Sequence, residues 1–142
     1  MRMLMLTIMA VLLTTQQIAA QEATSGKVVR QEGQASFFQA GQDGNTLTKS
    51  GELVDPQGYT AASRDLPFGT VATVTNQENG KSVDVRINDR GPTRTDRIID
   101  VSEQTARGLG MEEAGVAPVV IEANPSRQQD PQVRSQLESA AQ

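Results

Sequence analysis

Two short segments of alternating polarity, joined by an Asn-Gly dipeptide, constrain the fold of this chain more than any other feature. In residues 82–87, valine and isoleucine occupy every second position and polar side chains occupy the others. This is the period of a β-strand with one buried face. Residues 71–75 alternate in the same way, and Asn79-Gly80 lies between the two segments. The sequence therefore predicts a β-hairpin at residues 71–87.

Further short apolar segments extend the β pattern. Residues 35–40, 98–101 and 116–121 are predicted strands, and Pro118 in the last of them is typical of an edge or a barrel rim. A helix of about two turns is expected over residues 103–109, with Gly110 ending it. Many short strands and little helix favour a small all-β barrel. Periodicity alone does not distinguish its topology from that of an OB-fold.

The chain contains no histidine and no cysteine. Ser-His-Asp triads, thiol nucleophiles and zinc sites built from His and Cys are therefore excluded, and acid–base chemistry depends on carboxylates. Disulfides are excluded as well, so stability must come from packing. The net charge of −4 gives no bulk attraction to nucleic acid or to anionic membranes.

The two ends of the chain have their own signatures. Arg2, the apolar run at residues 3–13 and the small residues at 18–20 predict a signal peptide over residues 1–20. The alternative is a membrane anchor, but the run is about half the ~20 residues of a spanning helix. No lipobox cysteine is present, so we expect a periplasmic or exported protein without a stable membrane anchor.

These features divide the chain into four parts. After the signal peptide, residues 21–32 are expected to be a flexible lead-in, and residues 33–123 to form one domain. Residues 124–142 are rich in glutamine, serine and charge, which predicts a disordered tail.

Five segments, in order, resemble the recurring phrases of the rare lipoprotein A (RlpA) family of peptidoglycan lytic transglycosylases. Residues 85–92 have the sequence V-R-I-N-D-R-G-P and match their phrase residue for residue. The other four phrases correspond to residues 33–39, 48–52, 59–70 and 97–102. The resemblance covers about residues 33–122, and five phrases in order are a specific signal. It departs from the family at Ser63, where the family has histidine, and at Phe37 and Phe38, where it has Trp and Tyr.

The resemblance implies an all-β fold: a small six-stranded double-psi β-barrel with one or two short helices. It implies endolytic, non-hydrolytic cleavage of the β-1,4 bond between N-acetylmuramic acid and N-acetylglucosamine in peptide-free glycan strands, with 1,6-anhydromuramic ends. No metal and no cofactor are required. The expected partner is the peptidoglycan glycan strand, and the expected state is a monomer that binds no nucleic acid.

Three carboxylates are the candidate catalytic residues. Asp89 continues the apolar face of its strand, and partial desolvation there suits a general acid; the alternative is that it only shapes the following turn. The resemblance favours the first interpretation and adds Glu52, which would otherwise be a solvated charge. Asp100 is either a supporting site residue or, in competition with Ser102, the N-cap of the helix that follows.

The candidate substrate-binding residues are Phe38, Ser63, Arg90 and Arg97. Four arginines lie between residues 86 and 97, and the planar fork of one or two of them suits the lactyl carboxylate of N-acetylmuramic acid. The alternative is that Arg90 and Arg97 pair with neighbouring aspartates and hold the loop. Phe38 is either a sugar-stacking residue or part of the core.

Ser63 leaves a second function open. A serine cannot tune the carboxylate as a histidine can, and a positioned acid–base group is typically worth about 10² to 10⁴ in rate. The enzyme is therefore expected to be weak, or the chain is a non-catalytic, expansin-like glycan-binding module. A barrel-shaped inhibitor or effector is a third alternative, for which the sequence offers nothing specific.

Overall fold

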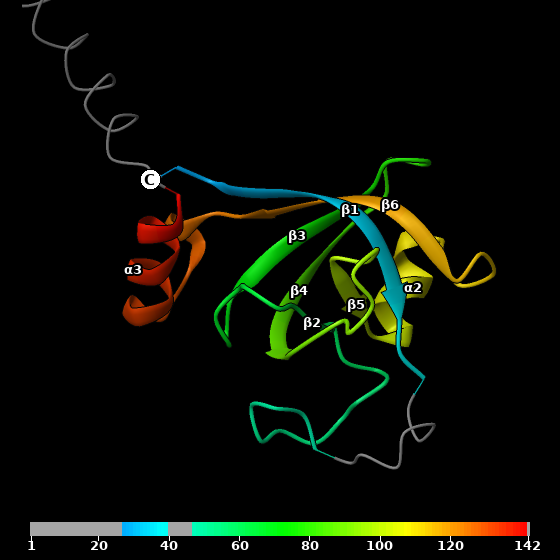
Figure 1. Ribbon diagram of the computed structural model, residues 1–142, viewed down its shortest axis with the longest axis horizontal. Helices are drawn as coiled ribbons and strands as arrows, with labels where there is room; N and C mark the ends of the chain where they lie inside the picture. Colours follow the sequence, from blue (N-terminus) through cyan, green and yellow to red (C-terminus); the bar gives the residue numbers. More distant parts are fainter. Residues whose placement is uncertain (1–26, 40–46, 142) are drawn as a thin grey trace, which may run out of the picture.

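A computed structural model of the chain describes residues 27–39 and 47–141. The expected signal peptide and the first part of the lead-in lie outside these residues. Six strands form one closed barrel in the order β1-β5-β2-β4-β3-β6 (Figure 1). The strands are β1 Val29–Phe37, β2 Thr60–Ala62, β3 Val71–Asn76, β4 Ser82–Asp89, β5 Ile99–Val101 and β6 Val116–Ala123. The predicted small six-stranded all-β barrel is confirmed.

The barrel mixes strand directions. β1 pairs with β5, and β2 pairs with β4, in parallel, whereas the other four neighbouring pairs are antiparallel. The predicted hairpin is the β3–β4 pair, in which Val74 lies opposite Val83. At its turn Gly80 has φ 74°, a conformation that glycine adopts without steric cost. Alternate residues of the long strands point inward and fill the barrel with valine and isoleucine.

Two short helices lie on opposite sides of the strands (Figure 1). Helix α2 (Glu103–Leu109) has the predicted bounds, and Gly110 ends it in the left-handed conformation. Its N-cap is Ser102, whose hydroxyl accepts a hydrogen bond from Thr105 N at 3.2 Å. Leu109 of α2 and Leu137 of helix α3 (Pro131–Ala140) are both fully buried.

The expectation of a disordered tail over residues 124–142 is wrong for the residues that the structure describes there. A short 3-10 helix, η1 (Pro125–Arg127), leads into α3, and Asp130 caps α3 with Pro131 in its first turn. Val133 and Leu137 are one helical turn apart and bury one face of α3. This small apolar face packs on the core cluster of the barrel, so the segment is folded despite its polar composition.

Gln128 ties this C-terminal segment to the barrel. Its side-chain amide accepts from Val71 N at 2.8 Å and donates to Val71 O at 2.9 Å. The β3–β6 ladder extends only to Thr73 opposite Glu122. The buried amide of Gln128 therefore satisfies the backbone groups that the next strand does not reach.

The first strand begins earlier than predicted. Residues 29–32, assigned to the flexible lead-in, belong to β1 and pair with residues 120–123 of β6. Their side chains are exposed or half-buried, so no strong apolar pattern marks them. Strand β2 was not predicted either, because it is only three residues long and all three are buried.

Candidate functional site

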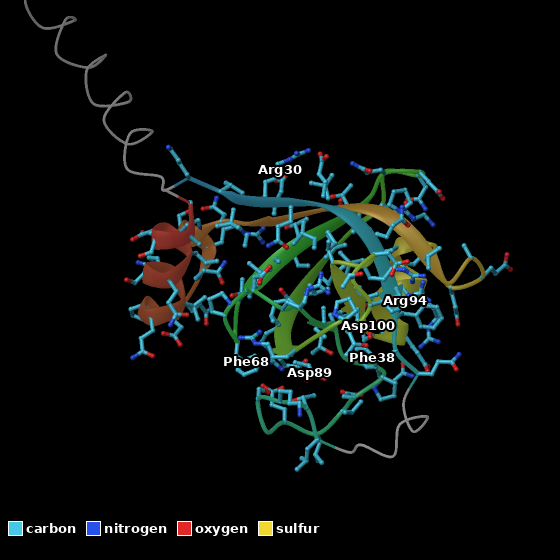
Figure 2. The ribbon with its side chains drawn as sticks, viewed as in Figure 1. Arg30, Phe38, Phe68, Asp89, Arg94 and Asp100 are labelled. Atoms are coloured by element: carbon cyan, nitrogen blue, oxygen red, sulfur yellow. The ribbon has the colours of Figure 1, made fainter. Side chains whose placement is uncertain are left out.

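A hollow of about 630 Å³ lies where several strands and loops meet at one side of the barrel. Its walls include residues 36–39 at the end of β1, residues 47–49, the end of β4 and the loop of residues 90–94. Asp89 and Asp100 both line it, as do Phe38 and Arg94 (Figure 2). Arg90 lines it as well. Four of the seven candidate residues from the sequence thus converge on one surface, and Arg94 joins them.

The barrel places Asp89 and Asp100 on either side of one small residue. In the strand register, Ala62 of β2 lies opposite Asp89 of β4 and also opposite Asp100 of β5. Two strand spacings put their Cα atoms roughly 10 Å apart. Because Ala62 has only a methyl side chain, little stands between the two carboxylates on that face.

The Asp89 side chain is fixed through one of its oxygens. Oδ1 accepts hydrogen bonds from Lys49 N at 2.9 Å and from Arg90 N at 2.8 Å. Within the described residues Oδ2 receives no hydrogen bond, so it is the oxygen that is available to a ligand. The hydrogen bond from Arg90 N agrees with the turn-shaping alternative, and the site role of Asp89 stays a prediction.

Asp100 does not cap helix α2, because Ser102 does. The half-buried Asp100 carboxylate instead accepts from the Ser36 hydroxyl at 3.3 Å, across the β1–β5 pair. The capping alternative is therefore wrong. The side chain belongs to the wall of the hollow.

Glu52 lies in a second, adjoining hollow of about 620 Å³ rather than beside Asp89. Arg86 binds it with both ends of its guanidinium, at 2.5 and 2.7 Å. The hydrogen bonds from Arg86, with a weaker one from Asn88, lower the pKa of the Glu52 carboxyl below its ordinary value despite partial burial. Asn88 and Asp55 line both hollows, so the two form a continuous surface.

Ser63 and Arg97 line neither hollow. The Ser63 side chain is buried, and its hydroxyl accepts from Leu66 N at 3.1 Å and Asp65 N at 3.3 Å. Ser63 N donates to Asp89 O at 3.1 Å, so the residue is a backbone neighbour of the site. Arg97 is mostly covered and lies 3.7 Å from the Asp96 carboxylate.

Two arginines bind main-chain carbonyls in a reciprocal arrangement, here called the arginine clamp. Arg90 donates to Ser63 O at 3.0 Å and Leu66 O at 2.8 Å. Arg64 donates in the opposite direction, to Pro92 O at 2.6 Å and Arg97 O at 2.7 Å. The clamp joins residues 63–66 to residues 90–97.

The alternative in which Arg90 pairs with an aspartate is wrong, because Arg90 binds these carbonyls and lies 3.9 Å from the centroid of the Phe68 ring. Its position over the ring is that of a cation–π contact. For Arg97 the same alternative is supported by its contact with Asp96.

Some site residues were not predicted from the sequence. Asp55 lines both hollows, but in the sequence it precedes Pro56 and has the signature of a turn, and its carboxylate does accept from Gln57 N at 2.9 Å. Arg64 lines neither hollow but holds the loop beside the first one, and no sequence pattern predicted this because its partners are backbone carbonyls. Of the two adjacent phenylalanines, Phe38 lines the first hollow and Phe37 packs against the core.

In the described parts of the chain, no three acidic side chains come close enough to hold a metal ion. No helix among those residues combines the length and the apolar character needed to cross a membrane.

Comparison with known proteins agrees with this architecture. The sequence model of the lytic transglycolase family matches residues 30–121. A Treponema pallidum protein named probable endolytic peptidoglycan transglycosylase RlpA is 53% identical over 97 residues, which are 68% of this chain and 30% of the relative. A Nostoc protein of the same name is 55% identical over 93 residues, 64% of this chain and 25% of the relative. This chain therefore spans about a quarter to a third of the length of these relatives.

A solved structure gives the same picture of the fold. The apo expansin of Clavibacter michiganensis superimposes with a TM-score of 0.53 at 25% identity, over 67% of this chain and 50% of the expansin.

Proposed function

Since this chain belongs to the RlpA-like family of double-psi β-barrel lytic transglycolases, we propose that it is an endolytic peptidoglycan transglycosylase. It cleaves the β-1,4 bond between N-acetylmuramic acid and N-acetylglucosamine in peptide-free strands and leaves 1,6-anhydromuramic ends. The observation that supports this most directly is the hollow in which Asp89 and Asp100 flank Ala62. The names of the relatives supply the substrate and the reaction class.

In the proposed mechanism Asp89 acts first as acid and then as base. Its protonated carboxyl donates to the glycosidic oxygen as the bond breaks through an oxocarbenium-like transition state. The resulting carboxylate then takes the proton of the muramic C6 hydroxyl, whose oxygen closes the 1,6-anhydro ring at C1. The proton that left Asp89 is thereby restored, and no water is consumed.

The other carboxylates serve the same reaction without exchanging protons. Glu52, bound by Arg86, stays ionised near neutral pH, so it supplies negative charge or accepts substrate hydroxyls along the second hollow. Asp100 accepts from substrate on the far side of Ala62. We assign substrate contact to Phe38 and Arg90 rather than to Ser63 and Arg97, because only the first two line the hollow.

The location follows from the substrate. A peptidoglycan-cleaving domain acts outside the cytoplasmic membrane, and we propose that the mature protein works in the periplasm as a monomer after removal of a signal peptide. We expect the mature protein to be recovered without detergent and to begin near Gln21, which mass spectrometry of the intact protein measures.

Asp89→Asn tests the proposed catalytic role. The amide oxygen of asparagine can still accept from Lys49 N and Arg90 N, so the fold is retained while the proton donor is lost. Release of anhydromuramic products from peptide-free strands, measured by mass spectrometry, should fall at least about 100-fold. Asp84→Asn is the matched control, because Asp84 is on the same strand but pairs with Thr73 and Arg127 away from the hollow. Wild-type product release by Asp89→Asn would overturn the assignment.

Two observations favour a second candidate, a glycan-binding module without catalysis. Serine stands at position 63, and the chain shares 25% identity and its fold with an expansin. This alternative predicts that the wild-type protein binds peptide-free strands but releases no anhydromuramic product. The same mass-spectrometric assay, combined with a pull-down on the strands, separates the two functions.

A further inference from the structure

Resting on the proposed function, we propose that Arg94 determines which glycan is bound by pairing with the free lactyl carboxylate of N-acetylmuramic acid. Arg94 lies on the loop after β4 and lines the hollow that holds Asp89 and Asp100. Its side chain is 68% exposed. In Figure 2 it is drawn on the same side of the barrel as Asp100 and Phe38.

The neighbouring arginines are committed to other partners. Arg86 is bound by both oxygens of Glu52 and lines only the second hollow. Arg90 donates to two backbone carbonyls and covers the Phe68 ring. Arg97 is only 17% exposed and does not line the hollow. Among the arginines between residues 86 and 97, Arg94 is therefore the one placed to meet a carboxylate in the hollow.

The present partner of the Arg94 side chain, the carboxylate of Asp96, shows which kind of group this guanidinium can bind. Nε and Nη2 of Arg94 donate to the two oxygens of Asp96, at 3.0 and 2.9 Å. Both side chains are exposed, and a pair of this kind is weak because water and salt screen it. A carboxylate of a bound ligand has the same planar shape as Asp96 and can take its place in the fork.

The backbone under Arg94 is held in position before any ligand arrives. Arg64 donates to the carbonyl of Arg94 itself at 3.3 Å, and to Pro92 O and Arg97 O on either side. The base of the Arg94 side chain is thereby fixed relative to the hollow. Less conformational entropy is then lost when the guanidinium engages a ligand.

The lactyl group of N-acetylmuramic acid is charged in only some of the glycan strands of the cell wall. Where a stem peptide is attached, the lactyl carboxyl is an amide and is neutral; where the peptide has been removed, it is a carboxylate. The protein itself has a net charge of −4, and Asp89 and Asp100 line the same hollow. An anionic sugar therefore needs a local cation, and Arg94 would make the hollow select stripped strands over strands with peptides.

Binding of two matched ligands tests this inference: peptide-free glycan oligomers, and the same oligomers with their lactyl carboxyls amidated. Calorimetry is carried out in the Asp89→Asn background, so that nothing is cleaved during the titration. Arg94→Gln should weaken binding of the native oligomer about fivefold to tenfold and leave the amidated oligomer unchanged. Asp96→Asn should strengthen binding of the native oligomer, because it removes the internal competitor.

Arg30→Gln is the control. Arg30 pairs with Glu32 two residues away at 2.6 Å, with both side chains about as exposed as those of Arg94 and Asp96. It lies on the far side of the barrel from Asp89 (Figure 2). This variant should bind both oligomers as the parent does.

Equal loss on both oligomers, no loss in Arg94→Gln, or no binding of the native oligomer by the parent would each overturn the inference. The proposed function is judged separately, by whether the wild-type protein releases anhydromuramic products. A protein that cuts strands without any Arg94 effect retains the function and loses the inference. A protein that binds through Arg94 but releases no anhydromuramic product retains the inference about binding and loses the proposed catalytic function.

Discussion

Two carboxylates of this site, Asp89 and Glu52, have different surroundings, and the difference separates their roles. Asp89 is held by two backbone N–H groups through one oxygen. Glu52 is held by a full guanidinium through both oxygens. A carboxylate bound in the second way is a poor proton donor at neutral pH. We therefore propose Asp89, rather than Glu52, as the acid of the reaction.

Arg86→Gln should raise the pKa of Glu52 back toward its ordinary value, because the hydrogen bonds from Arg86 are the main cause of the lowered pKa. NMR titration of the side-chain carboxyl carbons measures this directly. In the wild-type protein, the stabilisation from the pair is present above the ordinary pKa of glutamate and is lost as the pH falls through the lowered one. The loss in unfolding free energy is small, since both side chains are 43% exposed.

Arg127→Gln is the control for that titration. Arg127 pairs with Asp84 on the same strand as Arg86, and Thr73 and Arg127 together lower the pKa of Asp84. Arg127→Gln should raise the pKa of Asp84 and leave the pKa of Glu52 unchanged. An unchanged Glu52 titration in Arg86→Gln would contradict the assignment.

Several site residues were predictable because they lie in motifs, and others were not because their partners are backbone atoms. Asp89 ends β4, Asp100 lies within β5 and Phe38 follows β1. All three belong to the family phrases and line the hollow. Ser63 lies within such a phrase as well, but its hydroxyl accepts from the turn it begins. Nothing in the sequence shows that Arg64 reaches carbonyls 28 to 33 residues further on. Contacts of that kind depend on how the loops meet in space.

At the scale of the elements, helix α3 shows how composition misleads. Residues 124–142 are polar, and composition predicts disorder. Yet Asp130-Pro131 is a helix start, and Val133 and Leu137 lie on one face one turn apart. Two apolar residues suffice here because the barrel provides the rest of the interface.

Leu137→Ala should lower the unfolding free energy by about 2–4 kcal/mol, because Leu137 is fully buried in the core cluster. Thermal unfolding followed by circular dichroism would show it as a lower Tm. Leu53→Ala is the control, since Leu53 is 72% exposed, and it should change the free energy by less than about 0.5 kcal/mol. An unchanged Tm in Leu137→Ala would mean that α3 does not pack on the barrel in solution.

The predicted start of strand β1 was wrong for a different reason. Residues 29–32 are held in β1 mainly by backbone pairing with β6, and pairing between the two ends of a chain leaves no periodic signal. The hairpin and helix α2 were predicted correctly because their signals are local. Turn chemistry, alternation and a C-terminal glycine are all contained within a few residues.

At the scale of the whole molecule, stability depends on closure, because the chain has no cysteine to form a disulfide. Strand β1 lies between β5 and β6 and joins the two edges of the sheet. Its neighbours are the last two strands in sequence, so the barrel closes only when distant parts of the chain meet. Such folds form slowly, typically in milliseconds to seconds.

A chain that begins at Gly33 should therefore be less stable than one that begins at Lys27. The shorter chain loses four strand pairings, from Val29 opposite Ala123 to Glu32 opposite Val120, and part of one barrel edge is left open. We expect a lower Tm with a single unfolding transition retained. Equal melting temperatures would show that residues 27–32 contribute nothing to closure.

The arginine clamp has a consequence for altering ligand preference by mutation. Arg64 holds the loop of residues 92–97 through main-chain oxygens, which every amino acid supplies. Substitutions at Thr93, Arg94 and Asp96 therefore leave the anchoring acceptors in place. A combinatorial library at these three positions should yield folded variants at high frequency. Charge reversal at Arg94 alone, with Asp96 kept, leaves two acidic side chains on the loop and is a direct route to barrels that prefer cationic glycans.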